Sequence, residues 1–144
     1  MTEALQADRT NNVAIARSIF VDFNPHDPAW QANLADDVEM VFPYAESIGL
    51  PPKVEGKEAA IGVFQAVADA LGLSFLDTTA VAMADPEWVL VEQKGRGSFK
   101  GKPYNQQYAI MLQFRDGKLR HYREYFDCKV VTDCFGSIEN LLAG

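Results

Sequence analysis

The N-terminal part of the chain has a helical pattern of apolar positions. Residues 12–23 carry Val13, Ala16 and Phe20 at helical spacing, and Pro25 and Pro28 after them end this helix. The pattern continues with a short helix at residues 28–34, a strand at 38–42, a loop or flap at 43–54 and a third helix at 56–71.

After Gly72 the apolar period changes from helical to strand-like. Asp85-Pro86 marks one turn, and Asp116-Gly117 is a strong hairpin signal. Four strands are predicted, at residues 73–83, 88–99, 104–115 and 118–126. The tail, residues 127–144, is predicted to be a loop followed by a short helix at residues 137–142.

This order of elements predicts an α+β fold. Strands joined by tight hairpins form an antiparallel sheet, and the helices that precede them cover one of its faces. Gly95 and Gly97 allow the long strands to bend. We therefore expect a cone-shaped, curved antiparallel sheet wrapped around the N-terminal helices, with a small organic ligand bound in its mouth.

Length and charge fit one globular domain spanning residues 1–144. A chain of 144 residues buries about 68–70% of its unfolded surface and needs no disulfide or metal to be stable. Its formal net charge of −7, from 20 acidic and 13 basic residues, argues against nucleic acid or an anionic membrane surface as a partner. No apolar run approaches the roughly 20 residues of a membrane span.

The cysteines and histidines suggest no metal site. Cys128 and Cys134 match no zinc spacing, and His26 and His121 lie far apart in the chain. We expect free thiols, no metal and no cofactor. With no signal-peptide pattern at the N-terminus, the thiols favour the cytoplasm.

Glu124 is the candidate acid or base. Side chains alternate along a strand, so Tyr122, Glu124 and Phe126 share one face of the last predicted strand. A carboxylate between two aromatic rings is partly desolvated, which raises its pKa toward the range useful for proton transfer. If the parity of the strand differs by one residue, His121 and Arg123 occupy the pocket instead.

The candidate substrate-binding side chains are aromatic or offer hydrogen bonds. They are Tyr108, Tyr122, Gln106, Phe42, Trp88 and Phe126. A pocket with aromatic walls and a carboxylate at its base suits a planar or polycyclic molecule. The same residues also have an ordinary structural interpretation, because aromatic side chains favour strands in any core and Glu124 can pair with a nearby arginine or lysine.

Three stretches of the sequence resemble a known family. They are Leu34-Ala35-Asp36-Asp37-Val38-Glu39-Met40, then Glu55-Gly56-Lys57-Glu58, then Phe114-Arg115-Asp116-Gly117-Lys118-Leu119 leading to Glu124. Their order resembles the SnoaL-like branch of the nuclear-transport-factor-2-like (ketosteroid-isomerase-like) superfamily. Asp85-Pro86, Trp88 to Glu92 and Arg123-Glu124-Tyr125-Phe126 bring the chain nearest to the PhzA/PhzB phenazine-biosynthesis group. The resemblance implies the cone fold and a homodimer formed through the outer sheet face.

The resemblance implies a catalytic role for one residue of this chain, whereas three catalytic residues of the steroid isomerases have no counterpart here. The polyketide cyclases and the PhzA/PhzB group place an acidic residue in the last strand, at the position of Glu124. The steroid isomerases use a tyrosine, a base and an aspartic acid where this chain has Ile19, Phe42 and Ile110. Classical steroid isomerase activity is therefore not expected.

Two hypotheses about function follow. The first is a cofactor-free enzyme of isomerase, cyclase or condensation type, with Glu124 moving a proton on an aromatic or carbonyl-bearing metabolite. The alternative is a non-catalytic small-molecule-binding or dimerisation module of the same fold. Burying a carboxylate costs free energy, so a buried Glu124 is more readily explained by a catalytic role, which favours the first hypothesis.

Overall fold

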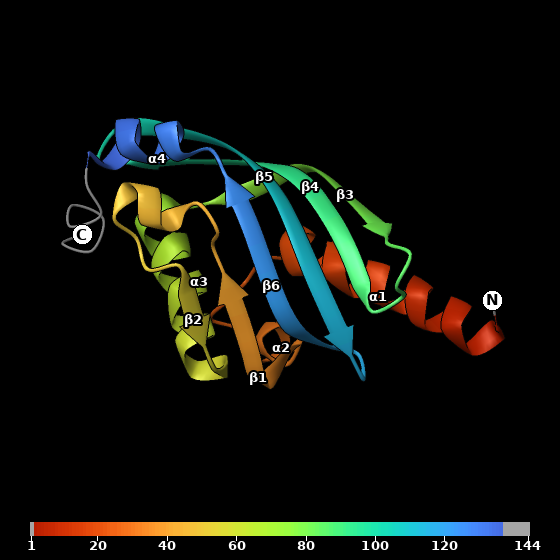
Figure 1. The fold of residues 1–144 in the computed structure, drawn as a ribbon. Coiled ribbons are helices and arrows are strands. Elements are labelled where there is room, and N and C mark those ends of the chain that lie inside the picture. The colour runs from red at the N-terminus through yellow and green to blue at the C-terminus, as the bar shows by residue number, and fades with distance from the viewer. Residues whose placement is uncertain (1, 137–144) are drawn as a thin grey trace.

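The computed structural model describes residues 2–136 and consists of one curved sheet with helices against its concave side (Figure 1). The helices are α1 (Glu3–Val21), α2 (Pro28–Gln31), the 3₁₀ turn η1 (Ala45–Ile48), α3 (Lys57–Leu71) and α4 (Cys128–Phe135). The strands are β1 (Leu34–Val41), β2 (Lys53–Glu55), β3 (Ser74–Ala82), β4 (Trp88–Phe99), β5 (Lys102–Arg115) and β6 (Lys118–Phe126). The helix predicted at residues 137–142 lies outside the described residues.

The six strands form one sheet in the order β2-β1-β6-β5-β4-β3. Strands β3 to β6 are antiparallel neighbours, as the hairpin signals predicted. Strand β1, however, runs parallel to β6, with Met40 opposite Tyr122. The α+β prediction of a curved sheet around helices is confirmed, but the sheet is mixed at this pair. A parallel pair cannot be joined by a hairpin, so no local turn signal announces it.

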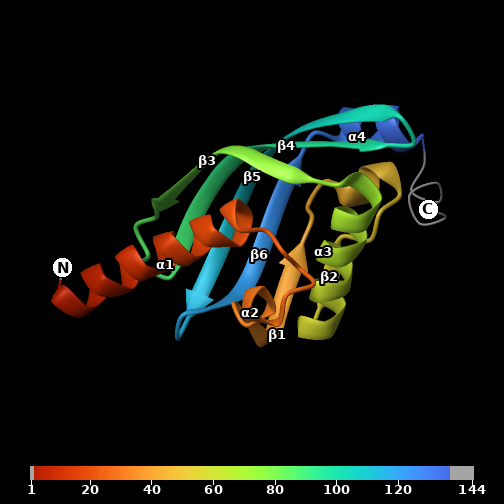
Figure 2. The same cartoon turned by 180° about the vertical axis from the view of Figure 1, so that it is seen from behind.

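Two helices divide the inner face of the sheet between them. Helix α1 packs mainly on β3 and β4, whereas α3 packs mainly on β1, with fewer contacts to β2 and β4. Figure 2 shows this face, with α1 and α3 on either side and β5 and β6 between them. Residues of β5 and β6 that point inward therefore face the space between the two helices.

An aromatic cluster fills the space between the helices and the sheet. Phe20 and Phe23 come from α1 and its end, Phe64 from α3, and Phe75 and Tyr122 from the sheet. The Phe64 ring lies 5.4 Å from Tyr122 and 6.1 Å from Phe23, and the Phe75 ring lies 5.2 Å from Phe20. These edge-to-face contacts join both helices to the sheet.

A second apolar cluster lies at the α4 end of the sheet. Cys134 and Phe135 of α4 are buried against Leu71, Phe99 and Tyr104. The sequence-based expectation of a loop here is wrong, because Asp127 caps a helix: its carboxylate accepts from the backbone N–H of Lys129 at 3.0 Å and of Val130 at 3.4 Å.

Three other segments differ from the sequence-based expectation. Helix α1 begins at Glu3, capped by Thr2, well before residue 12, because its first turns are exposed and need no apolar stripe. Strand β1 begins at Leu34 rather than residue 38. The predicted loop at 43–54 contains η1 and most of β2, whose three residues pair with β1 and are too short to show a period.

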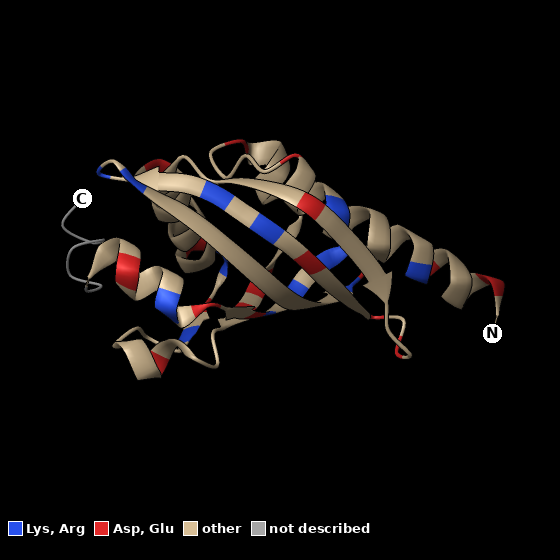
Figure 3. Ribbon diagram, turned by 90° about the horizontal axis from the view of Figure 1, so that it is seen from above, with Lys and Arg blue, Asp and Glu red and all other residues tan. Residues whose placement is uncertain are grey.

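Charged residues of both signs are mixed over the surface. Figure 3 shows basic and acidic positions interspersed along the strands. Lys94 pairs with Asp77 at 3.1 Å, and Arg115 pairs with Glu87 at 3.3 Å. The expectation that nucleic acid is not the partner stays a prediction. Among residues 2–136, no helix is long and apolar enough to cross a membrane.

Candidate active site

The parity of β6 places Glu124 on the inner face. Tyr122 is 2% exposed and packs in the core, so Glu124 and Phe126, two and four residues later, point to the same side. His121 points outward, where its Nδ1 lies 3.2 Å from Glu39 Oε1. The alternative parity, with His121 and Arg123 in the interior, is therefore excluded. Burial, and secondarily Arg123, lower the pKa of His121.

The Glu124 carboxyl is enclosed by protein, although the residue as a whole is only half-buried. Desolvation raises the pKa of this carboxyl to about 7. The Tyr122 hydroxyl opposes that effect by donating a hydrogen bond of 2.6 Å to Glu124 Oε1. A carboxyl with such a pKa is present in both its protonated and ionised forms near neutral pH, as a proton-transfer group requires.

Strand β5 provides the next row of inward side chains. Ile110 stands opposite Glu124, and Tyr108 stands opposite Phe126. Tyr108 is buried beside Phe75, and its hydroxyl lies 3.5 Å from that of Tyr104. Burial holds the pKa of Tyr108 well above its ordinary value, so the hydroxyl stays protonated and able to donate.

Phe42 and Phe126 lie with this group. The Phe42 ring is 6.3 Å from the Tyr122 ring, and both Phe42 and Phe126 pack against the main core. The structure therefore brings Glu124, Tyr122, Tyr108, Phe42 and Phe126 to one region of the inner face. Whether they bind a ligand stays a prediction.

Gln106 faces inward too, but its amide is fully occupied. Its Nε2 donates to the Tyr104 hydroxyl at 3.2 Å and to the Asp127 carbonyl at 3.0 Å. Its Oε1 accepts from the backbone N–H of Asp127 at 2.7 Å and of Gln107 at 3.0 Å. These four bonds use both donors and both acceptor sites of the amide, so Gln106 connects β5 to α4 and has nothing left for a ligand.

Trp88 does not belong to this group. Val89 and Val91 are fully buried on the inner face, so Trp88 lies on the outer face of β4. Its ring contacts the ring of His121 at 5.6 Å. The prediction that Trp88 lines the same pocket as Glu124 is wrong, because the two side chains lie on opposite faces of the sheet.

Sequence reasoning missed Gln93, a buried polar residue of the inner face. It is 4% exposed and follows Val89 and Val91 in the buried row of β4. Its Oε1 accepts a hydrogen bond of 2.9 Å from the Thr78 hydroxyl. The signal in the sequence is a glutamine at an inward position of β4, following the apolar inward residues Val89 and Val91.

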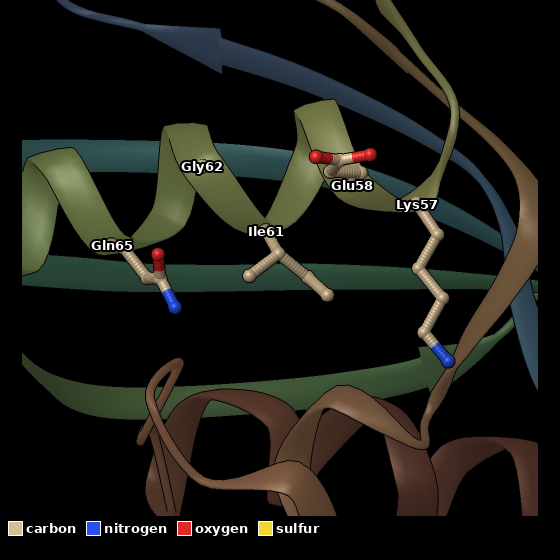
Figure 4. A pocket seen from close by; sticks show the side chains of 5 residues that line it. All are labelled: Lys57, Glu58, Ile61, Gly62 and Gln65. Carbon is tan, nitrogen blue, oxygen red and sulfur yellow. The ribbon is translucent and has the colours of Figure 1, made fainter.

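The hollows found at the surface lie away from Glu124. One, of about 570 Å³, is lined by Lys57, Glu58, Ile61, Gly62 and Gln65 along the open side of α3 (Figure 4). Another, of about 600 Å³, lies between the start of β1 and the β5–β6 hairpin and has a lining rich in charged side chains. Neither combines a perturbed carboxyl with apolar walls, so we place the candidate site at Glu124 on chemical grounds.

Among the described residues, the three isomerase positions, the possible metal ligands and the two cysteines give no second candidate site. At the three isomerase positions, Ile19 and Ile110 are fully buried and Phe42 is half-buried, and none carries a titratable group. Within residues 2–136, no three histidine, cysteine or acidic side chains gather as a metal site. Cys128 and Cys134 are free thiols.

Comparison with known proteins agrees with this architecture. A family model described as a SnoaL-like domain matches residues 16–122. The uncharacterised protein YesE of Bacillus subtilis is 30% identical over 139 residues, covering 94% of this chain and 91% of YesE. A crystal structure named as a candidate isomerase from Bacillus subtilis superposes with a TM-score of 0.74 at 26% identity, covering 94% of this chain and 96% of that chain. A phenazine biosynthesis-related protein of Pseudomonas aeruginosa gives a TM-score of 0.78 at 16% identity, covering 94% and 91% of the two chains, and shares the fold.

Proposed function

Because the chain belongs to the SnoaL-like domain family, as its motif order predicted, we propose that it is a cofactor-free enzyme of isomerase or cyclase type. Its substrate is an aromatic or carbonyl-bearing metabolite, and Glu124 is its acid and base. The observation that carries this proposal is the enclosed Glu124 carboxyl, with a pKa near 7 and one hydrogen bond from Tyr122.

The chemistry follows from the two states of that carboxyl. Ionised Glu124 removes a proton from a carbon next to a carbonyl group, and the electron pair of the C–H bond moves toward the carbonyl oxygen. Protonated Glu124 then returns the proton to a different carbon. Proton transfer of this kind contributes about 10²–10⁴-fold in rate. The Tyr122 hydroxyl stabilises the ionised form that begins the cycle.

The test is exchange of the α-protons of 2-tetralone, a bicyclic ketone, measured by NMR in D₂O. We expect wild-type protein to accelerate the exchange, with a rate that rises with pH through about 7, as Glu124 ionises. Glu124→Gln should lose the acceleration. The matched control is Glu92→Gln, at an exposed carboxylate on the outer face of β4. Equal exchange by wild type and Glu124→Gln would refute the role of Glu124.

A specific observation supports the alternative, a non-catalytic binding module: the three isomerase positions hold Ile19, Phe42 and Ile110, none of which can transfer a proton. The aromatic cluster of Phe20, Phe23, Phe64, Phe75 and Tyr122 fills the interior above the sheet. A ligand then enters only if these side chains move. Saturable binding of 2-tetralone without any proton exchange would support the binding module over the enzyme.

We also propose that the protein is a homodimer formed through the outer face of the sheet. Val81 is 59% exposed there, and the side chains of Trp88, Leu90 and Met111 are half-buried on the same face. Light scattering after size-exclusion chromatography tests this, with Leu90→Lys as the variant expected to shift a dimer to monomer. A wild-type monomer at micromolar concentration would contradict it.

We place the protein in the cytoplasm, because both thiols are free and a reducing compartment keeps them so. Fractionation of cells that express the full chain tests this assignment. Recovery of the protein outside the cytoplasmic fraction would contradict it.

A further inference from the structure

Gln93 carries a buried amide that is only half satisfied. The residue is 4% exposed, and its Oε1 accepts from the Thr78 hydroxyl at 2.9 Å. Its Nε2 is buried and has no hydrogen-bond partner among the described residues. Buried amide N–H groups are nearly always paired, because leaving one unpaired costs free energy. A group of this kind on an inner face is therefore a candidate for contact with a bound molecule.

The strand register places Gln93 on the same inner surface as Glu124. Gln93 stands opposite Tyr108, which stands opposite Phe126. Val91, two residues earlier on β4, stands opposite Ile110, which stands opposite Glu124. Gln93 is thus two strands across from Glu124 and one inward position along, or roughly 10 Å across and roughly 7 Å along the strands. On the concave face of a curved sheet the ends of long side chains lie closer together than their backbones, so both can reach neighbouring atoms of one molecule.

Thr78 fixes the direction of the Gln93 amide. It lies within the break in the β3–β4 register between Leu76 and Thr79, and its backbone carbonyl accepts a hydrogen bond from Arg17 of α1 at 3.2 Å. The hydroxyl and the backbone carbonyl of Thr78 therefore both have hydrogen-bond partners. With Oε1 of Gln93 held by the Thr78 hydroxyl, Nε2 is the end of the amide that is buried without a partner among the described residues.

We propose that Gln93 Nε2 donates a hydrogen bond to the carbonyl oxygen of the molecule whose proton Glu124 moves. This inference rests on the proposed function and narrows its substrate class to ketones whose carbonyl oxygen faces Gln93 while the neighbouring C–H bond faces Glu124. When Glu124 takes the α-proton, the C–H electron pair forms a C=C bond and the carbonyl π pair moves to oxygen as an enolate. The Gln93 N–H then stabilises the new negative charge. Return of the proton restores the enzyme, and nothing else is consumed.

The probe is 2-tetralone, and the decisive variant is Gln93→Met, which keeps the length of the side chain and removes the amide. The control is Gln107→Met, at an exposed position on β5. Infrared spectroscopy of the bound ketone should show a C=O stretch at lower wavenumber in wild type and Gln107→Met than in Gln93→Met. The kcat/KM for proton exchange should fall about 10²-fold in Gln93→Met, the loss typical of one oxyanion donor.

The outcomes separate this inference from the proposed function. One outcome is that Gln93→Met leaves both the C=O stretch and the exchange rate unchanged while Glu124→Gln abolishes exchange. The proposed role of Gln93 is then wrong, and the proposed enzymatic role of Glu124 is retained. If the C=O shift depends on Gln93 but wild type shows no exchange, Gln93 binds the carbonyl and the proposed enzymatic function is wrong. Wild-type protein that binds no 2-tetralone, or binds it with an unshifted C=O stretch, overturns the inference.

A second variant covers the case in which Gln93→Met does not fold. Thr78→Val removes the hydroxyl that orients the amide and leaves Gln93 in place. We expect a smaller shift of the C=O stretch and a loss of exchange between those of wild type and Gln93→Met. An unchanged stretch in Thr78→Val would show that the Thr78 contact does not direct Nε2.

Discussion

Glu124 and Tyr122 are two residues apart on β6, so both side chains point to the inner face and the hydroxyl lies 2.6 Å from the carboxyl. The hydroxyl favours the ionised carboxylate, whereas burial favours the protonated acid. Burial is the larger effect, since the pKa of Glu124 rises to about 7. The folded protein therefore holds this proton more tightly than the unfolded chain does.

That difference predicts how stability depends on pH. Below about pH 4 the carboxyl is protonated in both states, and as pH rises from about 4.5 to 7 only the unfolded chain loses the proton. The Glu124 contribution to stability should thus fall by about 3 kcal/mol over this range. Glu124→Gln, which stays neutral, should equal wild type near pH 4 and exceed it at pH 8.

Urea unfolding of both proteins at several pH values measures this difference. A constant difference in unfolding free energy from pH 4 to pH 8 would show that the carboxyl is solvated. It would also remove the main support for acid/base chemistry at Glu124.

Gly95 is needed because the Tyr108 ring lies against it. A Cβ built at Gly95 would be 2.7 Å from Tyr108 Cε2. Gly95→Ala should therefore displace Tyr108 and destabilise the protein by about 1–3 kcal/mol. Gly62→Ala on α3, where a Cβ meets nothing within 4 Å, should stabilise it by about 0.5–1 kcal/mol. Thermal unfolding compares the two, and a Gly95→Ala protein as stable as wild type would contradict this packing.

The sheet face that a side chain occupies could be predicted from the sequence only relative to other residues of the same strand. Glu124 and Tyr122 were placed on one face because alternation on a single strand is enough. Trp88 was misplaced, because relating faces of two different strands requires their register. The unpaired Nε2 of Gln93 depends on Thr78, which lies within a register break that no local pattern shows.

The junction between β5 and α4 depends on one side chain. Gln106 is fully buried and makes four hydrogen bonds, two of them to the backbone of Asp127. Gln106→Leu leaves these groups buried without partners and should lower the unfolding free energy by about 2–4 kcal/mol. Gln113→Leu, which removes one part-buried bond to Glu87, should lower it by about 1 kcal/mol. Similar urea midpoints for the two variants would contradict the role of Gln106.

At the level of elements, turn chemistry made the long strands predictable. Strands β4 and β6 have the predicted bounds, because Asp85-Pro86 and Asp116-Gly117 define where they begin. The β1–β6 pairing joins segments more than 80 residues apart, with Leu34 opposite Leu119. It depends on packing of the whole chain, so it could not be inferred from neighbours in sequence.

Across the whole molecule, the aromatic cluster determines how a ligand reaches the interior. Phe64 is 6% exposed and contacts Phe23, Trp30 and Tyr122. Phe64→Ala should cost about 3–5 kcal/mol and leave an apolar cavity. Indole should then restore part of the stability, because a ligand that binds only the folded state raises its melting temperature.

The control for this prediction is Val21→Ala, at an apolar side chain of α1 that is 56% exposed. It should change stability little and gain nothing from indole. If indole stabilises Phe64→Ala no more than this control, the helices have closed over the deleted ring, and the interior does not keep space for a ligand.

The two edges of the sheet limit how copies of this protein can associate. At one edge β2 offers only three residues, with Lys53 paired to Glu39 and Glu55. At the other, β3 is interrupted at Asp77, whose φ is 55° and where the register with β4 shifts. Neither edge presents a long, flat row of free backbone groups to a strand of another chain. Growth into extended fibres through strands added at either edge is thus disfavoured.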